Sequence, residues 1–195
     1  SIYGLKTEKF NNEIIKNVSK INQKINISLN EVNYLLNPLN LSISISSKNP
    51  IIFLEDKSLE LSDINTNISL KSFIKSQFSV DDLKISTKEI QIKDLISLIR
   101  AIKEIPQLYV LDNITKAGLI SANIDLMFDL NGEIKKNYQV NGTVKKAKFN
   151  IFNKVEIENL DVSFDISKNQ LTLSKIETDL NSVKLKSPFI KIEEK

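Results

Sequence analysis

The sequence has no cysteine, no histidine and no tryptophan, and only one methionine, Met127, and one arginine, Arg100. Without cysteine or histidine the chain lacks the nucleophile–base systems of Cys/His and Ser/His/Asp enzymes. It also lacks the usual ligands of zinc and blue-copper sites. Disulfide bonds are excluded, so cysteine usage says nothing about the compartment. We therefore expect a protein that is not an enzyme and that uses no metal and no cofactor.

Glycine is scarce, with four residues in the chain. The phosphate-binding patterns G-x-x-x-x-G-K and G-x-G-x-x-G are absent. A small, tightly curved barrel would need more glycines to turn its corners. The scarcity of glycine thus argues against both a nucleotide site and a small barrel.

Asp and Glu are the remaining candidates for acid–base chemistry. Adjacent acidic pairs occur at Glu55-Asp56, Asp81-Asp82 and Glu193-Glu194. Neighbouring residues in a strand point to opposite faces, and acidic residues at turns are normally solvated, so adjacency does not create a shared site. No calcium loop of the form D-x-[DN]-x-[DN]-G is present. We assign no catalytic or metal-binding role to these pairs.

The net charge is small, +3, and lysine is spread along all 195 residues. A nucleic-acid-binding surface would cluster its cations, so we expect no nucleic-acid partner. The densest basic run, from Lys145 to Lys148, alternates with the strand pattern and predicts the polar side of a strand. No apolar stretch approaches the ~18 residues of a membrane-spanning helix.

Apolar residues recur at steps of three and four in three segments, which predicts about three helices. The first lies within residues 1–24, from Phe10 to Ile21. A short helix of about two turns includes Leu70 and Ile74. The third is expected over residues 93–106, where Asp94 is a plausible cap.

Elsewhere the apolar residues alternate with Ser, Asn, Asp and Lys, which predicts about ten to twelve antiparallel strands with one apolar face. Turns are expected at Asn37-Pro38, Asn131-Gly132 and Lys168-Asn169. The most regular alternation follows Gly118. Its apolar positions, before and after the turn, are Ile120, Ala122, Ile124, Leu126, Phe128, Tyr138 and Val140.

Alternation predicts an apolar face but does not say what covers it. One interpretation is a closed core, formed by a sandwich or by a sheet under the helices. The other is an open groove whose lining is available to lipid acyl chains. Both need apolar residues at every second position, so the period alone leaves both open.

The order of segments resembles a known family. A helix and a strand lead into L-N-P-L-N-L-S-I (residues 36–43). The segment F-S-V-D-D-L-K-I-S (78–86) follows, then G-L-I-S-A-N-I-D-L-M-F-D (118–129) and Y-Q-V-N-G-T-V-K-K-A (138–147). Together they resemble the N-terminal periplasmic part of bacterial AsmA-like proteins, relatives of TamB and YhdP.

The resemblance implies an elongated, highly curved antiparallel sheet that forms a β-groove, with an amphipathic helix at its N-terminus. It implies a periplasmic protein anchored in the bacterial inner membrane by an upstream helix that this chain does not contain. The expected function is to bind or conduct phospholipid acyl chains toward the outer membrane, with envelope proteins as further partners. The seven residues that alternate after Gly118 would line the groove.

These expectations give one domain over residues 1–195, as a piece of a longer chain. It comprises a helix (1–24), a first β region (25–92), a helix (93–106) and a second β region (118–195). The alternative function is a structural or assembly factor for outer-membrane biogenesis, with a closed β core and no ligand.

Overall fold

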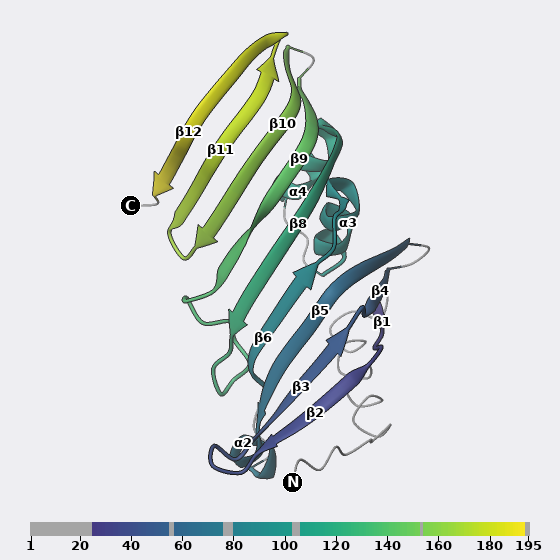
Figure 1. The fold of residues 1–195 in the computed structure, drawn as a ribbon, viewed down its shortest axis with the longest axis vertical. Helices are drawn as coiled ribbons and strands as arrows, with labels where there is room; N and C mark the ends of the chain where they lie inside the picture. Colours follow the sequence, from purple (N-terminus) through teal and green to yellow (C-terminus); the bar gives the residue numbers. More distant parts are fainter. Residues whose placement is uncertain (1–24, 55–56, 76–79, 103–105, 153, 194–195) are drawn as a thin grey trace. The chain divides into compact units, whose positions relative to one another are not determined.

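The computed structural model describes residues 25–54, 57–75, 80–102, 106–152 and 154–193 (Figure 1). The helix expected within residues 1–24 lies outside the described residues, as does Phe78. Within the described part the fold is mainly β and antiparallel, as the alternation predicts.

The strands form an open antiparallel sheet in the order β1-β4-β5-β6-β8-β9-β10-β11-β12, in which β2 pairs with β3, β3 also with β5, and β7 with β8. Their bounds are β1 (Ile25–Ser28), β2 (Val32–Asn37), β3 (Ser42–Lys48), β4 (Ile51–Leu54), β5 (Lys57–Ser69), β6 (Val80–Thr87), β7 (Ile90–Gln91), β8 (Thr115–Met127), β9 (Gln139–Ile151), β10 (Val155–Ser167), β11 (Gln170–Leu180) and β12 (Val183–Glu193). The helices are α2 (Leu70–Ile74), α3 (Ile92–Ile102) and α4 (Pro106–Ile114).

The chain divides into two compact units. Unit 1 comprises residues 1–87 and 123–139, and unit 2 comprises residues 88–122 and 140–195. Strand β8 therefore contributes its first residues to unit 2 and its last residues to unit 1.

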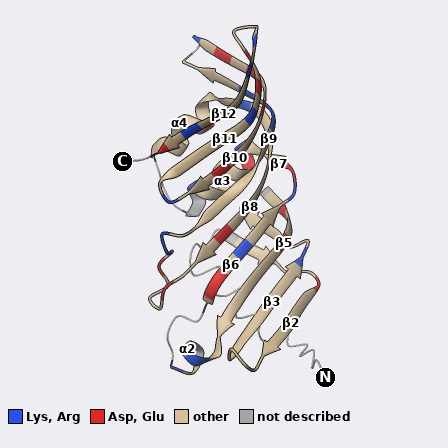
Figure 2. Ribbon diagram, turned by 60° about the vertical axis from the view of Figure 1, so that its left-hand side comes forward, with Lys and Arg blue, Asp and Glu red and all other residues tan. Residues whose placement is uncertain are grey.

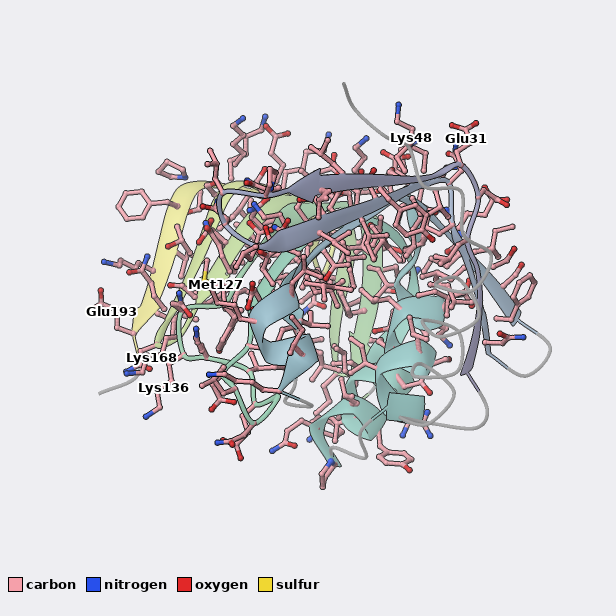
Figure 3. The ribbon with its side chains drawn as sticks, turned by 90° about the horizontal axis from the view of Figure 1, so that it is seen from below. Glu31, Lys48, Met127, Lys136, Lys168 and Glu193 are labelled. Atoms are coloured by element: carbon pink, nitrogen blue, oxygen red, sulfur yellow. The ribbon has the colours of Figure 1, made fainter. Side chains whose placement is uncertain are left out.

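Unit 1 is built on strands that are interrupted without losing their register. β1 pairs with β4, and β2 pairs with β3, in the same register. β3 and β4 both pair with β5, again in a single register. The interruptions lie at Glu31 and Asn49, whose φ angles of 44° and 48° are left-handed. Asn30 Nδ2 donates to the Asn49 carbonyl at 2.8 Å, and Glu31 lies beside Lys48 (Figure 3). The interruptions are thus matched across neighbouring strands.

Unit 2 has a corresponding row of irregularities, which we call the bulge row. It consists of Gly118 in β8, Lys146 in β9, Asn159 in β10 and Lys175 in β11, with φ angles of 135°, 48°, 51° and 54°. The β10–β11 register shifts on both sides of Asp161 and then returns to its original value. The backbone N–H of Lys146 donates to Asp161 Oδ1 at 2.7 Å, which ties β9 to β10 at this level.

The hairpin turns of unit 2 follow ordinary turn chemistry. The expected turn at Lys168-Asn169 is confirmed, because Ser167 pairs with Gln170. Asn181 and Ser182 form a two-residue turn between β11 and β12, with φ angles of 46° and 68°. Positive φ at both central residues is the pattern that matches the twist of a hairpin.

The core of unit 2 lies between its helices and its sheet. Ile92 and Ile96 of α3 pack on Ala147 of β9, and all three are buried. Five partly buried residues surround them: Leu108, Ile120, Val144, Phe149 and Leu160. Val144 and Phe149 are five positions apart, which would place them on opposite faces of a regular strand. Both contact the same cluster because the bulge at Lys146, between them, changes the phase of β9.

The helices confirm one expectation and correct another. α2 forms where the 3.6-residue period predicts it, and α3 covers most of the helix expected over residues 93–106. Asp94, expected as its cap, lies within the first turn because α3 begins at Ile92. Pro106 was expected to end a helix at residue 106, but it is the first residue of α4. Proline suits this position because the first helical residue needs no N–H donor and its φ is already helical.

Gly142 allows a close approach that no other residue would. A Cβ built on it would lie 2.1 Å from the Ser121 carbonyl oxygen and 2.8 Å from the Phe164 ring. We expect Gly142→Ala to lower the free energy of unfolding by about 2 kcal/mol, because the backbone of β8 must shift. Denaturant unfolding measures this change. Trimming the ring with Phe164→Leu removes only one of three close contacts, because the other two are to the backbone of Ser121 and Ala122, so a full rescue in the double variant would contradict this explanation.

Candidate functional site

The sheet of unit 1 has one apolar and one polar face, set by cross-strand rows. One apolar row is Val32, Ser47, Ile64, Ile85 and Ile124, and the next is Tyr34, Ile45, Thr66, Leu83 and Leu126. A third row contains Leu36, Ile43 and Ile68. We call these three rows the apolar face of unit 1. None of its positions carries a charged side chain.

Most of the apolar face is only half-buried. Ile45 at its centre is 5% exposed, whereas Ile43, Ile64, Leu83 and Ile124 are intermediate. Burial of the Tyr34 phenol on this face raises its pKa above 10.0. Of the described helices only α2 belongs to unit 1, and it spans five residues at one end of the sheet. The described residues therefore leave part of this face accessible.

The structure distributes the seven expected groove residues over both units. Ile124 and Leu126 lie on the apolar face of unit 1, beside Ile85 and Leu83 of β6. Phe128 and Tyr138 lie in the connection after β8 and are half-buried. Ile120, Ala122 and Val140 belong to unit 2, where Ala122 is buried.

In unit 2 the helices cover the part of the sheet that carries Ile120. α3 and α4 lie against β8 and β9 (Figure 1), and Ile120 packs on the cluster of Ile92, Ile96 and Ala147. The helices therefore cover part of the apolar side of β8 and β9, and Ile120 stays half-buried there.

One polar contact links the two covering helices. Arg100 Nη1 of α3 donates to Asp112 Oδ2 of α4 at 2.7 Å, and its guanidinium lies 4.0 Å from the centre of the Tyr109 ring. The Arg100 Nε is buried and has no hydrogen-bond partner. Thr115 Oγ1 donates to the Leu111 carbonyl at 2.6 Å and ties the end of α4 to β8.

The apolar rows of unit 2 continue to the end of its sheet. Phe164 pairs with Leu173 and then Ile190, and Ile166 pairs with Leu171 and then Ile192. Leu171 and Leu173 are half-buried, but Ile190 and Ile192 are exposed because no described strand follows β12.

The polar face of unit 1 carries a chain of hydrogen bonds. Ser44 Oγ bonds to Asn67 Oδ1 at 2.5 Å, and Asn67 Nδ2 donates to Asp82 Oδ2 at 2.8 Å. Asp82 Oδ1 is buried without a partner. The β5–β6 register shifts beside Asp81, between the pairs Asn67–Asp82 and Ile68–Val80. Desolvation first, and the Asp82 charge second, raise the pKa of Asp81 above 3.8, while Lys135 opposes them.

Among the described residues no three Asp or Glu side chains meet in a metal-binding group, and no helix is long and apolar enough to cross a membrane. Glu55, Asp56 and Glu194 lie outside the described residues. Comparison with family models, curated proteins and solved structures found no match to the chain.

The residues of β3, β5 and β6 on the apolar face were not among the groove residues predicted from the sequence. Ile45, Ile64 and Ile85 show the same period of two as β8. The signal was present, but alternation does not say which strands are neighbours. Pairing is set by turn geometry and register across the whole sheet.

The raised pKa of Asp81 predicts a pH-dependent penalty. Folding favours the protonated form of the Asp81 carboxyl group. The free energy of unfolding therefore has its full contribution from Asp81 at low pH and loses that contribution as the pH rises through the pKa of Asp81 in the folded protein. We expect Asp81→Asn to stabilise unit 1 at pH 7, by less than about 1 kcal/mol because the group is partly solvated. The gain should vanish below pH 3.8. Thermal unfolding across pH measures it, with Glu133→Gln as a control; an equal gain at all pH values would contradict the electrostatic cause.

Proposed function

We propose that the chain binds phospholipid acyl chains along the apolar face of unit 1. The observation that carries this proposal is the half-buried state of a face made from three apolar cross-strand rows. Binding an acyl chain there would remove apolar surface from water on both partners, at about 0.8 kcal/mol for each buried methylene.

The chemistry of the face favours a non-specific apolar ligand. Its polar atoms are the hydroxyls of Ser47, Thr66 and Tyr34, and it has no cation to hold a phosphate. Ser47 is already bonded, since its Oγ donates to the Asn30 carbonyl at 2.6 Å. Because apolar burial is non-directional, such a face would discriminate little between head groups.

The resemblance to AsmA-like proteins supplies the setting of the proposal. In that setting the chain is a non-catalytic periplasmic part of a protein anchored in the inner membrane, and it passes acyl chains toward the outer membrane along a β-groove. Further envelope proteins would be its partners.

A second candidate function is a structural or assembly factor with a closed core and no ligand. The packing of Ile92 and Ile96 of α3 on Ala147 favours it, because these buried residues cover part of the apolar side of the unit 2 sheet. The two candidates differ in whether unit 1 takes up lipid, which can be measured directly.

The absence of tryptophan gives a clean reporter for lipid uptake. Leu83 lies on the apolar face, and its neighbour Lys84 lies on the opposite face of the same strand. A phospholipid with brominated acyl chains, supplied as monomers, should quench the fluorescence of Leu83→Trp and leave Lys84→Trp unchanged. Equal quenching of both variants, or of neither, would contradict binding on this face.

A charge on the apolar face should prevent binding. We expect Ile124→Lys to reduce phospholipid that co-purifies with the chain, measured by mass spectrometry, by at least about tenfold, because an acyl chain cannot solvate an ammonium group. The matched control is Asn123→Lys, one residue earlier on the opposite face. Far-ultraviolet circular dichroism checks that both variants fold. If Ile124→Lys does not fold, Leu126→Lys is tested in its place. Lipid retained at the wild-type level in a folded variant would favour the closed core.

A further inference from the structure

One end of unit 1 exposes several large apolar side chains. Leu39 in the turn between β2 and β3 is 93% exposed, and Ile74 at the end of α2 is 80% exposed. Leu36 and Leu41, at the two sides of the turn, are exposed as well. Single exposed leucines are common on protein surfaces, but a group at one end of a sheet indicates an interaction surface.

The register shows that the turn and the helix lie together. Ser42, just after the turn, pairs with Ser69, the last residue before α2. The backbone N–H of Leu70 donates to the Leu41 carbonyl at 2.8 Å. We define the tip as residues Leu36 to Leu41, which comprise the end of β2 and the turn after it, together with residues Leu70 to Lys75.

The tip is basic as well as apolar. Lys71 and Lys75 are exposed, and neither tip segment contains an acidic residue. Figure 2 shows the basic residues of α2 in blue beside the uncharged end of β2 and β3. Exposed leucine and isoleucine side chains flanked by lysine are the composition of segments that lie in the interface of an anionic membrane.

The connection after β8 leaves the sheet at the same end and carries exposed apolar and basic residues, together with the acidic Asp129 and Glu133. Met127, the last residue of β8, pairs with Asp82 near the start of β6, and Lys135 N–H donates to the Met127 carbonyl at 2.7 Å. Leu130 and Ile134 are exposed, and Lys135 and Lys136 follow them. Met127 and Lys136 are labelled in Figure 3.

We infer that the tip docks unit 1 on an anionic lipid surface, with Leu39 and Ile74 inserted among the acyl chains and Lys71 and Lys75 against the head groups. A projecting turn suits a fluid bilayer, because each side chain can insert without a preformed pocket. A second copy of the chain would bring the same lysines face to face, which like-charge repulsion opposes. The inference goes beyond acyl-chain uptake on the sheet face and does not depend on it.

The test is co-sedimentation of the chain with vesicles of phosphatidylcholine, with and without phosphatidylglycerol. We expect binding to the anionic vesicles that weakens with salt. Leu39→Asp and Ile74→Asp should each reduce it by at least about tenfold, since a carboxylate cannot enter the interface. Lys71→Glu and Lys75→Glu should each reduce it by roughly fivefold or more, and only on anionic vesicles.

Matched substitutions elsewhere control for general effects. Phe152 lies in the turn between β9 and β10 of unit 2 and is 76% exposed, so Phe152→Asp removes a highly exposed apolar side chain that is not part of the tip. Lys168→Glu is the matched control for the lysine substitutions, because it reverses the charge of an exposed turn lysine. Both variants should bind as the unchanged protein does.

Three outcomes would overturn the inference: no binding to anionic vesicles, equal binding by the tip and control variants, or sedimentation velocity showing self-association that Leu39→Asp abolishes. The last result would assign the tip to a contact between copies. Quenching of Leu83→Trp by monomeric brominated lipid should persist in the Leu39→Asp background. Failure of docking and failure of acyl-chain binding are therefore separate results.

Discussion

The structure depends on cross-strand rows in which most apolar residues have an apolar neighbour on an adjacent strand. In unit 1 the pairing of β2, β3, β5, β6 and β8 places isoleucine and leucine on one face and serine, asparagine and lysine on the other. A slip of one residue in any pair would turn a whole strand over. The register is therefore held by all rows at once, which explains why twelve strands with few glycines can form one sheet.

The same rows account for the difference between the two units. In unit 2 the residues before β8 fold into α3 and α4, and Ile92 and Ile96 cover the rows that contain Ile120 and Val144. Arg100, Asp112 and Tyr109 hold the two helices together over this surface. In unit 1 the described helix is a single short one, and the corresponding rows stay half-buried. One pattern of residues thus packs against two helices in one unit and, among the described residues, against a single short helix in the other.

The fold class could be predicted from the sequence because alternation over thirteen residues, as in β8, has no helical interpretation. The residues that line a face could be predicted strand by strand, and Ile124 and Leu126 lie where the alternation puts them. What covers a face could not be predicted, because cover depends on residues far along the chain. α4 was missed because its apolar residues Leu108, Val110 and Leu111 form no clear stripe. The tip was missed because exposure of Leu39 is a property of the turn in three dimensions.

The bulge row has a consequence for how such a chain can change in length. A residue inserted into the regular part of a strand would reverse the faces of everything beyond it. At Asn159 and Lys175 the β10–β11 register shifts and then recovers, while the β11–β12 register stays unchanged, and Lys146 of β9 has the same left-handed φ. Single-residue insertions and deletions are therefore best tolerated at these levels, and elsewhere in the strands length can change only in steps of two. Relatives of this chain, aligned by their strands, would show their odd-numbered gaps at the bulges and their even-numbered gaps at the hairpins.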